Sequence, residues 1–264
     1  MIASGTPELG GAKNMLISAV LVIAHAILFQ APQILTLTRF KVIRVTSDDI
    51  RRLPNSMPAI FADPVPDGFP VDNLEEAAKR AGFTPQMLKG KTPKRLFITN
   101  MVSTEVTINV AALTAAVRDA KLQDITVPAA WDGVTLELQQ RPGVLIDYGD
   151  FYIAQGPPRI LTTPAGFAIA QCLEVMFRLM GIGTSEARAL RDSFAANAST
   201  YLPIAPRFDM DIREVALPSG SGLLLQNANK GGELAFMWST GDRSYFLTGL
   251  VTEDEVIAIA KTLQ

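Results

Sequence analysis

Histidine and cysteine are nearly missing from this chain of 264 residues, which holds one of each, His25 and Cys172. A single cysteine cannot form a disulfide within the chain. Ser-His-Asp and Cys-His nucleophiles need a histidine as base, and His25 lies inside an apolar run. A zinc site built from His and Cys ligands is excluded for the same reason. We therefore expect no catalytic residue, no cofactor and no metal ligand, and we predict that the protein is not an enzyme.

An excess of charge of either sign is missing too. The chain has 24 Lys and Arg residues against 26 Asp and Glu residues, a net charge of -2. Nucleic-acid-binding domains carry a basic patch or stripe, so we exclude nucleic acid as a partner. Cys172 lies in an apolar pattern of helical spacing with no basic neighbour to activate it. This setting predicts a buried structural thiol.

One long apolar run stands out, Met15–Phe29 (MLISAVLVIAHAILF), and a weaker apolar stretch continues it to Leu37. A spanning helix needs about 20 mostly apolar residues, and the run has no polar face. We predict a transmembrane anchor over residues 15–37, preceded by a short tail over residues 1–14. Two alternatives stay open. One is a cleaved signal peptide with a cleavage site at residues 24–26, and the other is a packed soluble helix.

The predicted anchor implies the lipid bilayer as a partner and a single-pass location in the cell membrane. Arg39, Lys41 and Arg44 follow the run, and the positive-inside rule would place them in the cytoplasm. That rule is weak for long translocated domains. We therefore expect residues 38–264 to lie outside the cytoplasm.

Residues 38–264 mix short alternating runs, which are typical of strands, with longer runs of helical spacing. Helices are predicted over residues 72–82, 110–121, 164–180, 184–196 and 253–263. Strands are predicted over residues 40–45, 95–99, 105–108, 134–138, 144–148, 151–154, 211–216, 223–226, 234–238 and 244–249. The predicted fold class is α+β, with an N-terminal transmembrane helix followed by short antiparallel strands and packed helices. A division near residue 160 into two similar sub-domains is left open.

Local signals fix some boundaries of these elements. Residues 141–143 (Arg-Pro-Gly) are predicted to be the hairpin turn between the strands 134–138 and 144–148. Thr252 and Glu255 have the spacing of a capping box at the start of the closing helix. Asp72 is the predicted cap of the helix over 72–82.

Three carboxylates, Glu137, Asp147 and Asp150, form the best candidate for acid–base chemistry. Glu137 and Asp147 would lie on neighbouring strands of one predicted hairpin. Each alternates with apolar residues, which places it on the solvated face of a sheet. A carboxylate-dependent hydrolase is therefore a third hypothesis, behind the two non-enzymatic functions given below.

Aromatic residues gather near the C-terminus, where Phe236, Trp238, Tyr245 and Phe246 face each other across a predicted hairpin. Trp131 lies beside a predicted turn. Four of these residues are the candidates for a ligand or partner surface, namely Trp131, Trp238, Tyr245 and Phe246. The alternative is that they pack in the core and across strands.

Three stretches carry a family resemblance. They are FKVIRVTSDDIRRLP after the apolar run, LEEAAKRAGF with the later Trp-Asp-Gly turn, and the closing MWSTGDRSYFLTGLVTEDEVIAIAKTL. Together they resemble the uncharacterised extracytoplasmic domain of bacterial membrane-bound anti-sigma-factor regulators. Such regulators carry a zinc-binding anti-sigma domain before the membrane, whereas only 14 residues precede the predicted anchor here. The resemblance implies the outer domain and its anchor alone.

These observations predict a membrane-anchored, non-enzymatic, extracytoplasmic domain for sensing or protein interaction, with a regulatory role implied by the resemblance. Its expected partners are the bilayer and an envelope protein. The alternative is an envelope protein that binds a lipid or another apolar ligand in a groove lined by the aromatic residues.

Overall fold

The computed structural model describes residues 32–54, 57, 68–204, 210–227 and 233–263, which form fourteen strands, six α-helices and one short 3-10 helix. The strands are β1 (Gln33–Leu37), β2 (Arg39–Arg44), β3 (Gly68–Val71), β4 (Arg95–Thr99), β5 (Val102–Thr107), β6 (Thr135–Gln140), β7 (Val144–Asp147), β8 (Phe151–Gly156), β9 (Arg159–Thr163), β10 (Ser199–Ile204), β11 (Met210–Leu217), β12 (Gly220–Asn227), β13 (Glu233–Ser239) and β14 (Ser244–Leu250). The helices are α2 (Ser47–Arg51), α3 (Leu74–Ala81), α4 (Val110–Asp119), the 3-10 turn η2 (Ala129–Trp131), α5 (Ile169–Leu179), α6 (Thr184–Ala196) and α7 (Glu253–Thr262).

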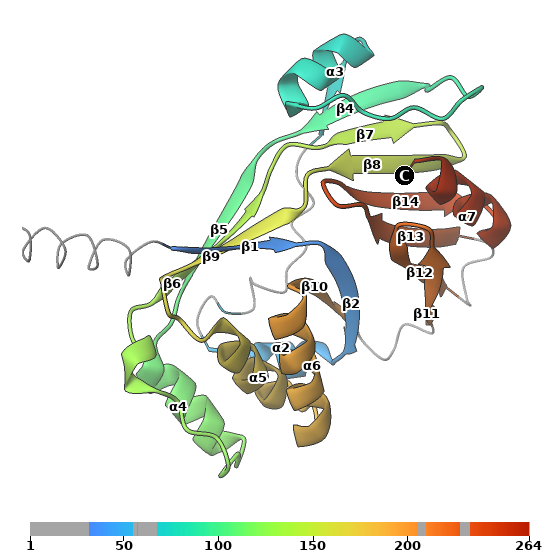
Figure 1. Cartoon of the computed structure of the whole chain (residues 1–264). Coiled ribbons are helices and arrows are strands. Elements are labelled where there is room, and N and C mark those ends of the chain that lie inside the picture. The colour runs from blue at the N-terminus through green and yellow to red at the C-terminus, as the bar shows by residue number, and fades with distance from the viewer. Residues whose placement is uncertain (1–31, 55–56, 58–67, 205–209, 228–232, 264) are drawn as a thin grey trace, which may run out of the picture.

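Three long, bent strands run through the whole molecule (Figure 1), built from β4 with β5, β6 with β7, and β8 with β9. Their upper halves belong to an eight-stranded sheet of order β11-β12-β13-β14-β8-β7-β4-β3. Their lower halves, with β1, form a four-stranded sheet of order β1-β9-β6-β5. The antiparallel register passes through the bend without slipping. Ile98 pairs with Val144 above the bend, and Val102 pairs with Gln140 below it, four residues further along each strand.

The inner face of the eight-stranded sheet carries large apolar side chains in rows across the strands. In one row Leu96, Ile146, Ile153, Leu247 and Phe236 are successive cross-strand neighbours, and none is more than 8% exposed. Helices α3 and α7 and the irregular residues 83–88 cover this face. The upper core therefore lies between one sheet face and a layer made partly of loop.

A buried glutamine fixes that loop to the sheet. The Gln155 side chain accepts a hydrogen bond from the Gln86 N–H at 2.8 Å and donates one to the Gln86 carbonyl at 2.6 Å. The Tyr245 hydroxyl donates to Oε1 of Gln86 at 2.9 Å, and the Leu88 N–H donates to the Tyr148 hydroxyl at 3.1 Å. Buried backbone groups need partners, and here side chains of the sheet supply them.

The lower core lies between the four-stranded sheet and the helices α4, α5 and α6, with Leu113, Met176 and Phe177 fully buried in it. Strands β2 and β10 form a separate two-stranded parallel sheet. One side of this small sheet contributes Ile43 and Tyr201 to the lower core. Its other side packs against the outer face of β12 and β13.

The prediction of a transmembrane helix over residues 15–37 is wrong for its last part. Gln33–Leu37 form β1, which pairs with β9 in antiparallel register. Pro32 has no backbone N–H to donate within a helix, and the alternating QILTL suits a strand with Leu35 and Leu37 turned inward. Residues 15–31 lie outside the described residues. Among those that are described, no helix has the length and apolar character that a membrane crossing requires.

The predicted fold class, an α+β protein with a transmembrane helix ahead of short strands and packed helices, is also wrong. Antiparallel sheet dominates the described residues, and several of the short strands are halves of long ones. Strand β14 pairs with β8, so segments on both sides of residue 160 share one sheet.

The predicted hairpin turn at residues 141–143 is wrong for the same reason. These residues lie at the bend between β6 and β7, within one long strand. The Gly143 N–H donates a hydrogen bond to the Thr99 hydroxyl at 2.8 Å, and the Gly143 carbonyl accepts one from the Thr99 N–H at 2.9 Å. Pro142 has no N–H and so removes one donor from the hydrogen-bond ladder. The strand bends at this point, and its pairing continues on both sides of the bend.

Several local predictions are confirmed. Thr252 and Glu255 form a complete capping box at the start of α7. Cys172 is fully buried, and burial raises the pKa of its thiol to about 12.

The predicted cap of α3 is wrong by one residue. The cap is Asn73 and not Asp72, because the Asn73 side chain accepts a hydrogen bond from the Glu76 N–H at 2.9 Å.

Gly222 tests the packing of the inner face. It lies beside the buried Phe236 ring, and a Cβ at this position would overlap the ring. We predict that Gly222→Ala lowers the free energy of unfolding by about 1–3 kcal/mol, the usual cost of overpacking a core. Urea denaturation measures the change. Ser221→Ala, on the exposed side of the same strand, is the matched control. Equal stability of the two variants would contradict this packing.

Candidate functional site

The four aromatic residues predicted to form a surface do not lie together. Trp131, Trp238 and Tyr245 are 5%, 0% and 2% exposed, whereas Phe246 is 39% exposed. Trp238 and Tyr245 are direct cross-strand partners and stack at 4.8 Å between ring centroids in the upper core. Trp131 packs edge-on against Phe167 in the lower core, at 5.6 Å between centroids. Of the four, only Phe246 is left on the surface.

The acidic candidates do not form a catalytic pair. Glu137 lies in β6 and Asp147 in β7 of one long strand. Ten residues separate them along the bent strand, a length of about 33 Å. Glu137 instead accepts hydrogen bonds from Ser103 at 2.7 Å and from Gln139 at 2.8 Å. Among the described residues, no cluster of three or more His, Cys, Asp or Glu side chains could hold a metal ion.

Asp147 is a buried carboxylate on the outer face of the eight-stranded sheet, and its side chain is 3% exposed. The Arg95 guanidinium binds it at 2.7 and 2.8 Å, and the Gly149 N–H donates to it at 2.7 Å. Burial opposes ionisation, but the hydrogen bonds from Arg95 and Gly149 outweigh it and hold the pKa of Asp147 below its usual range. The pair therefore stays charged at neutral pH.

A row of apolar residues crosses this outer face. Phe97, Leu145, Ala154 and Phe246 are successive cross-strand neighbours on β4, β7, β8 and β14. We call these four residues the open face. Phe97, Leu145 and Ala154 are half-buried, and none of the four belongs to the three hydrophobic clusters of the described residues.

The same row continues onto β13 and β12, where its residues are buried. Phe246 pairs with Met237, and Met237 pairs with Leu223. These last two are only 8% and 9% exposed, because they pack in the cluster that includes Phe40 of β2. The small β2–β10 sheet thus covers one half of the outer face and leaves the open face uncovered by any packed cluster of the described residues.

Sequence reasoning found Phe246 but missed Phe97 and Leu145. A signal was present, since RLFIT and VLID each hold three consecutive apolar residues. A strand with one solvated face alternates, whereas a strand covered on both faces reads as a continuous apolar run. Strands β4 and β7 therefore have the composition of strands that are buried on both faces.

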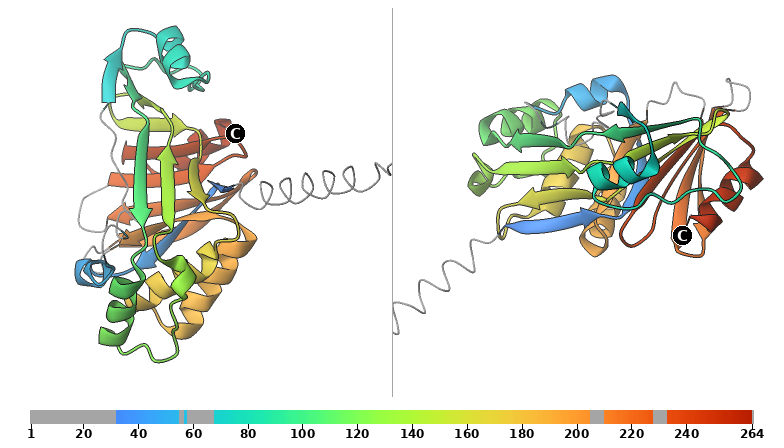
Figure 2. Two further views of the ribbon diagram at one scale, coloured as in Figure 1. Left: turned by 90° about the vertical axis from the view of Figure 1, so that its left-hand side faces the viewer. Right: turned by 90° about the horizontal axis from the view of Figure 1, so that it is seen from above.

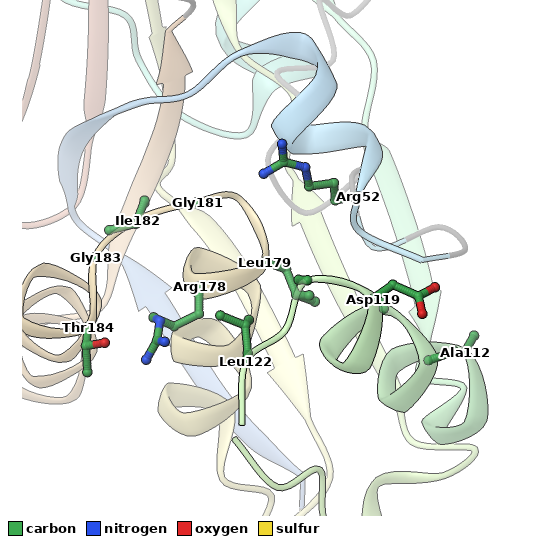
Figure 3. Close-up of a pocket in the computed structure, with 13 residues that line it drawn as sticks. Arg52, Ala112, Asp119, Leu122, Arg178, Leu179, Gly181, Ile182, Gly183 and Thr184 are labelled. Carbon is green, nitrogen blue, oxygen red and sulfur yellow. The ribbon is translucent and has the colours of Figure 1, made fainter. Parts of the chain in front are cut away.

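A second feature is an open depression of about 910 Å³ between α4 and the α5–α6 turn, lined by Arg52 and Arg178 (Figure 3). Arg178 is held by Asp124 at 2.8 and 3.1 Å, and Arg52 by Asp49 at 3.0 Å. Three alanines of α4, residues 112, 115 and 116, line the opposite wall. Both guanidinium groups are thus already paired with carboxylates.

The Arg95–Asp147 pair gives a pH-dependent prediction. The pKa of Asp147 is lowered in the fold, so its contribution to stability is present above the unfolded value of about 3.9. It is lost as the pH falls through the folded pKa. We expect Asp147→Asn to be less stable than wild type near pH 7, and we expect the difference to shrink near pH 3. Urea denaturation at both pH values measures it. Asp150→Asn, at an exposed neighbour, is the control, and a pH-independent difference would contradict the assignment.

No protein-family model, no curated protein and no solved structure matches this chain. The resemblance to anti-sigma-factor regulators stays a prediction.

Proposed function

We propose that this chain is a non-enzymatic protein-interaction domain that binds its partner through the open face. The observation that carries the proposal is the apolar row of Phe97, Leu145, Ala154 and Phe246, which no hydrophobic cluster of the described residues covers. A solvated face of an antiparallel sheet is normally polar. A contiguous apolar patch on such a face is typical of an interaction site.

The lower half of the molecule provides an internal comparison. There Glu105, Glu137 and Thr162 are successive cross-strand neighbours on the outer face of the four-stranded sheet. Two carboxylates and a hydroxyl in one row suit contact with water. Phe97, Leu145 and Ala154 of the apolar row lie on these same three long strands, so the change in composition belongs to the position and not to the fold.

The shape of the surface favours a protein over a small apolar ligand. Small-molecule sites are concave and enclose most of their ligand. The open face is one side of a sheet, and its side chains lie in a row across four strands. The apolar face of a helix or sheet in a partner protein can pack on such a surface as a further layer.

The proposal is tested by site-specific cross-linking. A photo-reactive amino acid replaces Phe246 in the full chain, which is expressed in its own organism and irradiated. We expect one protein to be cross-linked, and the same protein when Leu250 is replaced instead. Leu250 is 67% exposed and lies on the same side of β14.

Phe69 is the matched control. It is 42% exposed, similar to Phe246, but it pairs with Ile98 and so lies toward the inner face. A photo-reactive residue at Phe69 should not capture the partner. Capture from Phe69 as well, or a lipid adduct from Phe246 in place of a protein, would contradict the proposal.

The location outside the cytoplasm and the regulatory role stay predictions. We expect a reporter enzyme fused after Gln264 to be active only if it works outside the cytoplasm, with a cytoplasm-specific reporter as the control. Activity of the cytoplasmic reporter alone would contradict this location.

A further inference from the structure

The free edges of the two larger sheets are not alike. These edges are β1 and β5 in the four-stranded sheet and β11 and β3 in the eight-stranded sheet. An edge strand presents unpaired N–H and C=O groups, and proteins block it with charges or proline. Strand β3 has Pro70, β5 has Glu105, and β11 has Asp211, Arg213 and Glu214. Strand β1, QILTL, has neither a charge nor a proline.

The edge of β1 is accessible in the structure. Gln33, Ile34 and Thr36 are exposed, and Ile34 is 64% exposed. Within the described part of the chain, residues 33–37 make backbone hydrogen bonds only to β9. In the right-hand view of Figure 2, β1 is the outermost strand of its sheet.

We propose that β1 pairs in antiparallel fashion with β1 of a second copy of this chain. A two-fold axis perpendicular to the sheet makes such an interface self-complementary. It keeps the inner faces of both copies on one side, as the burial of Leu37 requires. The result is a continuous sheet of eight strands across two subunits, β5-β6-β9-β1 joined to its symmetry-related copy.

The register follows from the length of β1. Only a pairing centred on Leu35 matches all five residues of one strand with all five of the other. It places Leu35 opposite Leu35 of the second copy and Ile34 opposite Thr36 of the second copy. No charged side chains meet in this register. Self-pairing is therefore unopposed at β1.

Pairing of five residues buries little area, so the dimer is expected to be weak, with a dissociation constant in the micromolar range or above. Its effect on binding is larger than its area suggests. The axis places both open faces on the same side of the joined sheet, so a dimer offers two sites to a partner with two copies of its own binding element. The proposal does not depend on the open face, because it uses only the edge of β1.

Charge exchange at the edge tests the pairing. The double variant Ile34→Lys/Thr36→Lys places Lys opposite Lys twice, and Ile34→Glu/Thr36→Glu places Glu opposite Glu twice. We expect each full-length variant to be monomeric in sedimentation at concentrations where wild type is dimeric, with at least a tenfold weaker association. An equimolar mixture of the two variants should restore the dimer, because Lys then faces Glu. Restoration excludes misfolding as the cause.

The control places the same change on the opposite edge of the same sheet. Glu105→Lys/Thr107→Lys alters two exposed residues of β5 and should leave the dimer unchanged. A wild type that is monomeric up to about millimolar concentration, a dimeric lysine variant, or a mixture that stays monomeric would each overturn the proposal.

Cross-linking tests the register. Cys172 is fully buried with a raised pKa and does not compete for a thiol reagent. Chains with Ile34→Cys mixed with chains with Thr36→Cys should form a disulfide under mild oxidation faster than either chain alone. Equal rates in the mixture and in the separate chains would overturn the pairing centred on Leu35.

Discussion

The unbroken register of the three bent strands holds the two halves of the molecule together. Each of these strands contributes to both cores, as Ile98 does above the bend and Val106 below it. A slip of one residue on either side would turn a whole set of side chains to the other face. The two cores therefore share one constraint. Between β6 and β7, Pro142 and Gly143 change the direction of the strand while its pairing partners continue in order. The bend therefore alters the shape of the sheet, and each side chain stays on its own face.

The same constraint explains why no packed cluster of the described residues covers the open face. Strand β1 is fixed to β9 along all five of its residues, and only Thr38 separates it from β2. Strand β2 must therefore begin close to the lower sheet. It packs with β10 against β12 and β13. From that position it does not reach β4 and β7 at the opposite side of the eight-stranded sheet. The inner face, in contrast, is covered by two separate parts of the chain, α3 with the loop held by Gln155, and α7.

Local signals in the sequence predicted local structure well. The capping box at Thr252 needs only residues three positions apart, and the burial of Cys172 needs only the apolar spacing of its helix. What failed was the assignment of partners. Arg141-Pro142-Gly143 has the composition of a hairpin turn, and the register that makes it a bend is set by Thr99, more than forty residues earlier. The predicted anchor extends to Leu37 because the pure apolar run is too short to span a membrane, and Leu and Ile suit both helix and strand. The pairing of β1 with β9 decided between them, and a single sequence does not show that pairing.

The candidate site shows the same division. Phe246 was found because a hairpin places its residues side by side, so local pairing alone brought it near Trp238 and Tyr245. Alternation then separates neighbours, and Tyr245 enters the core while Phe246 points outward. Phe97 and Leu145 join Phe246 only through strand pairings that span long distances in the sequence. Single exposed apolar residues on a surface need no explanation. A row of four on adjacent strands does need an explanation. A hydroxyl at any of these positions would cost the fold little and would reduce the apolar surface that water contacts. The proposed interaction with another protein therefore depends on this row, on a sheet whose other face already satisfies the needs of folding.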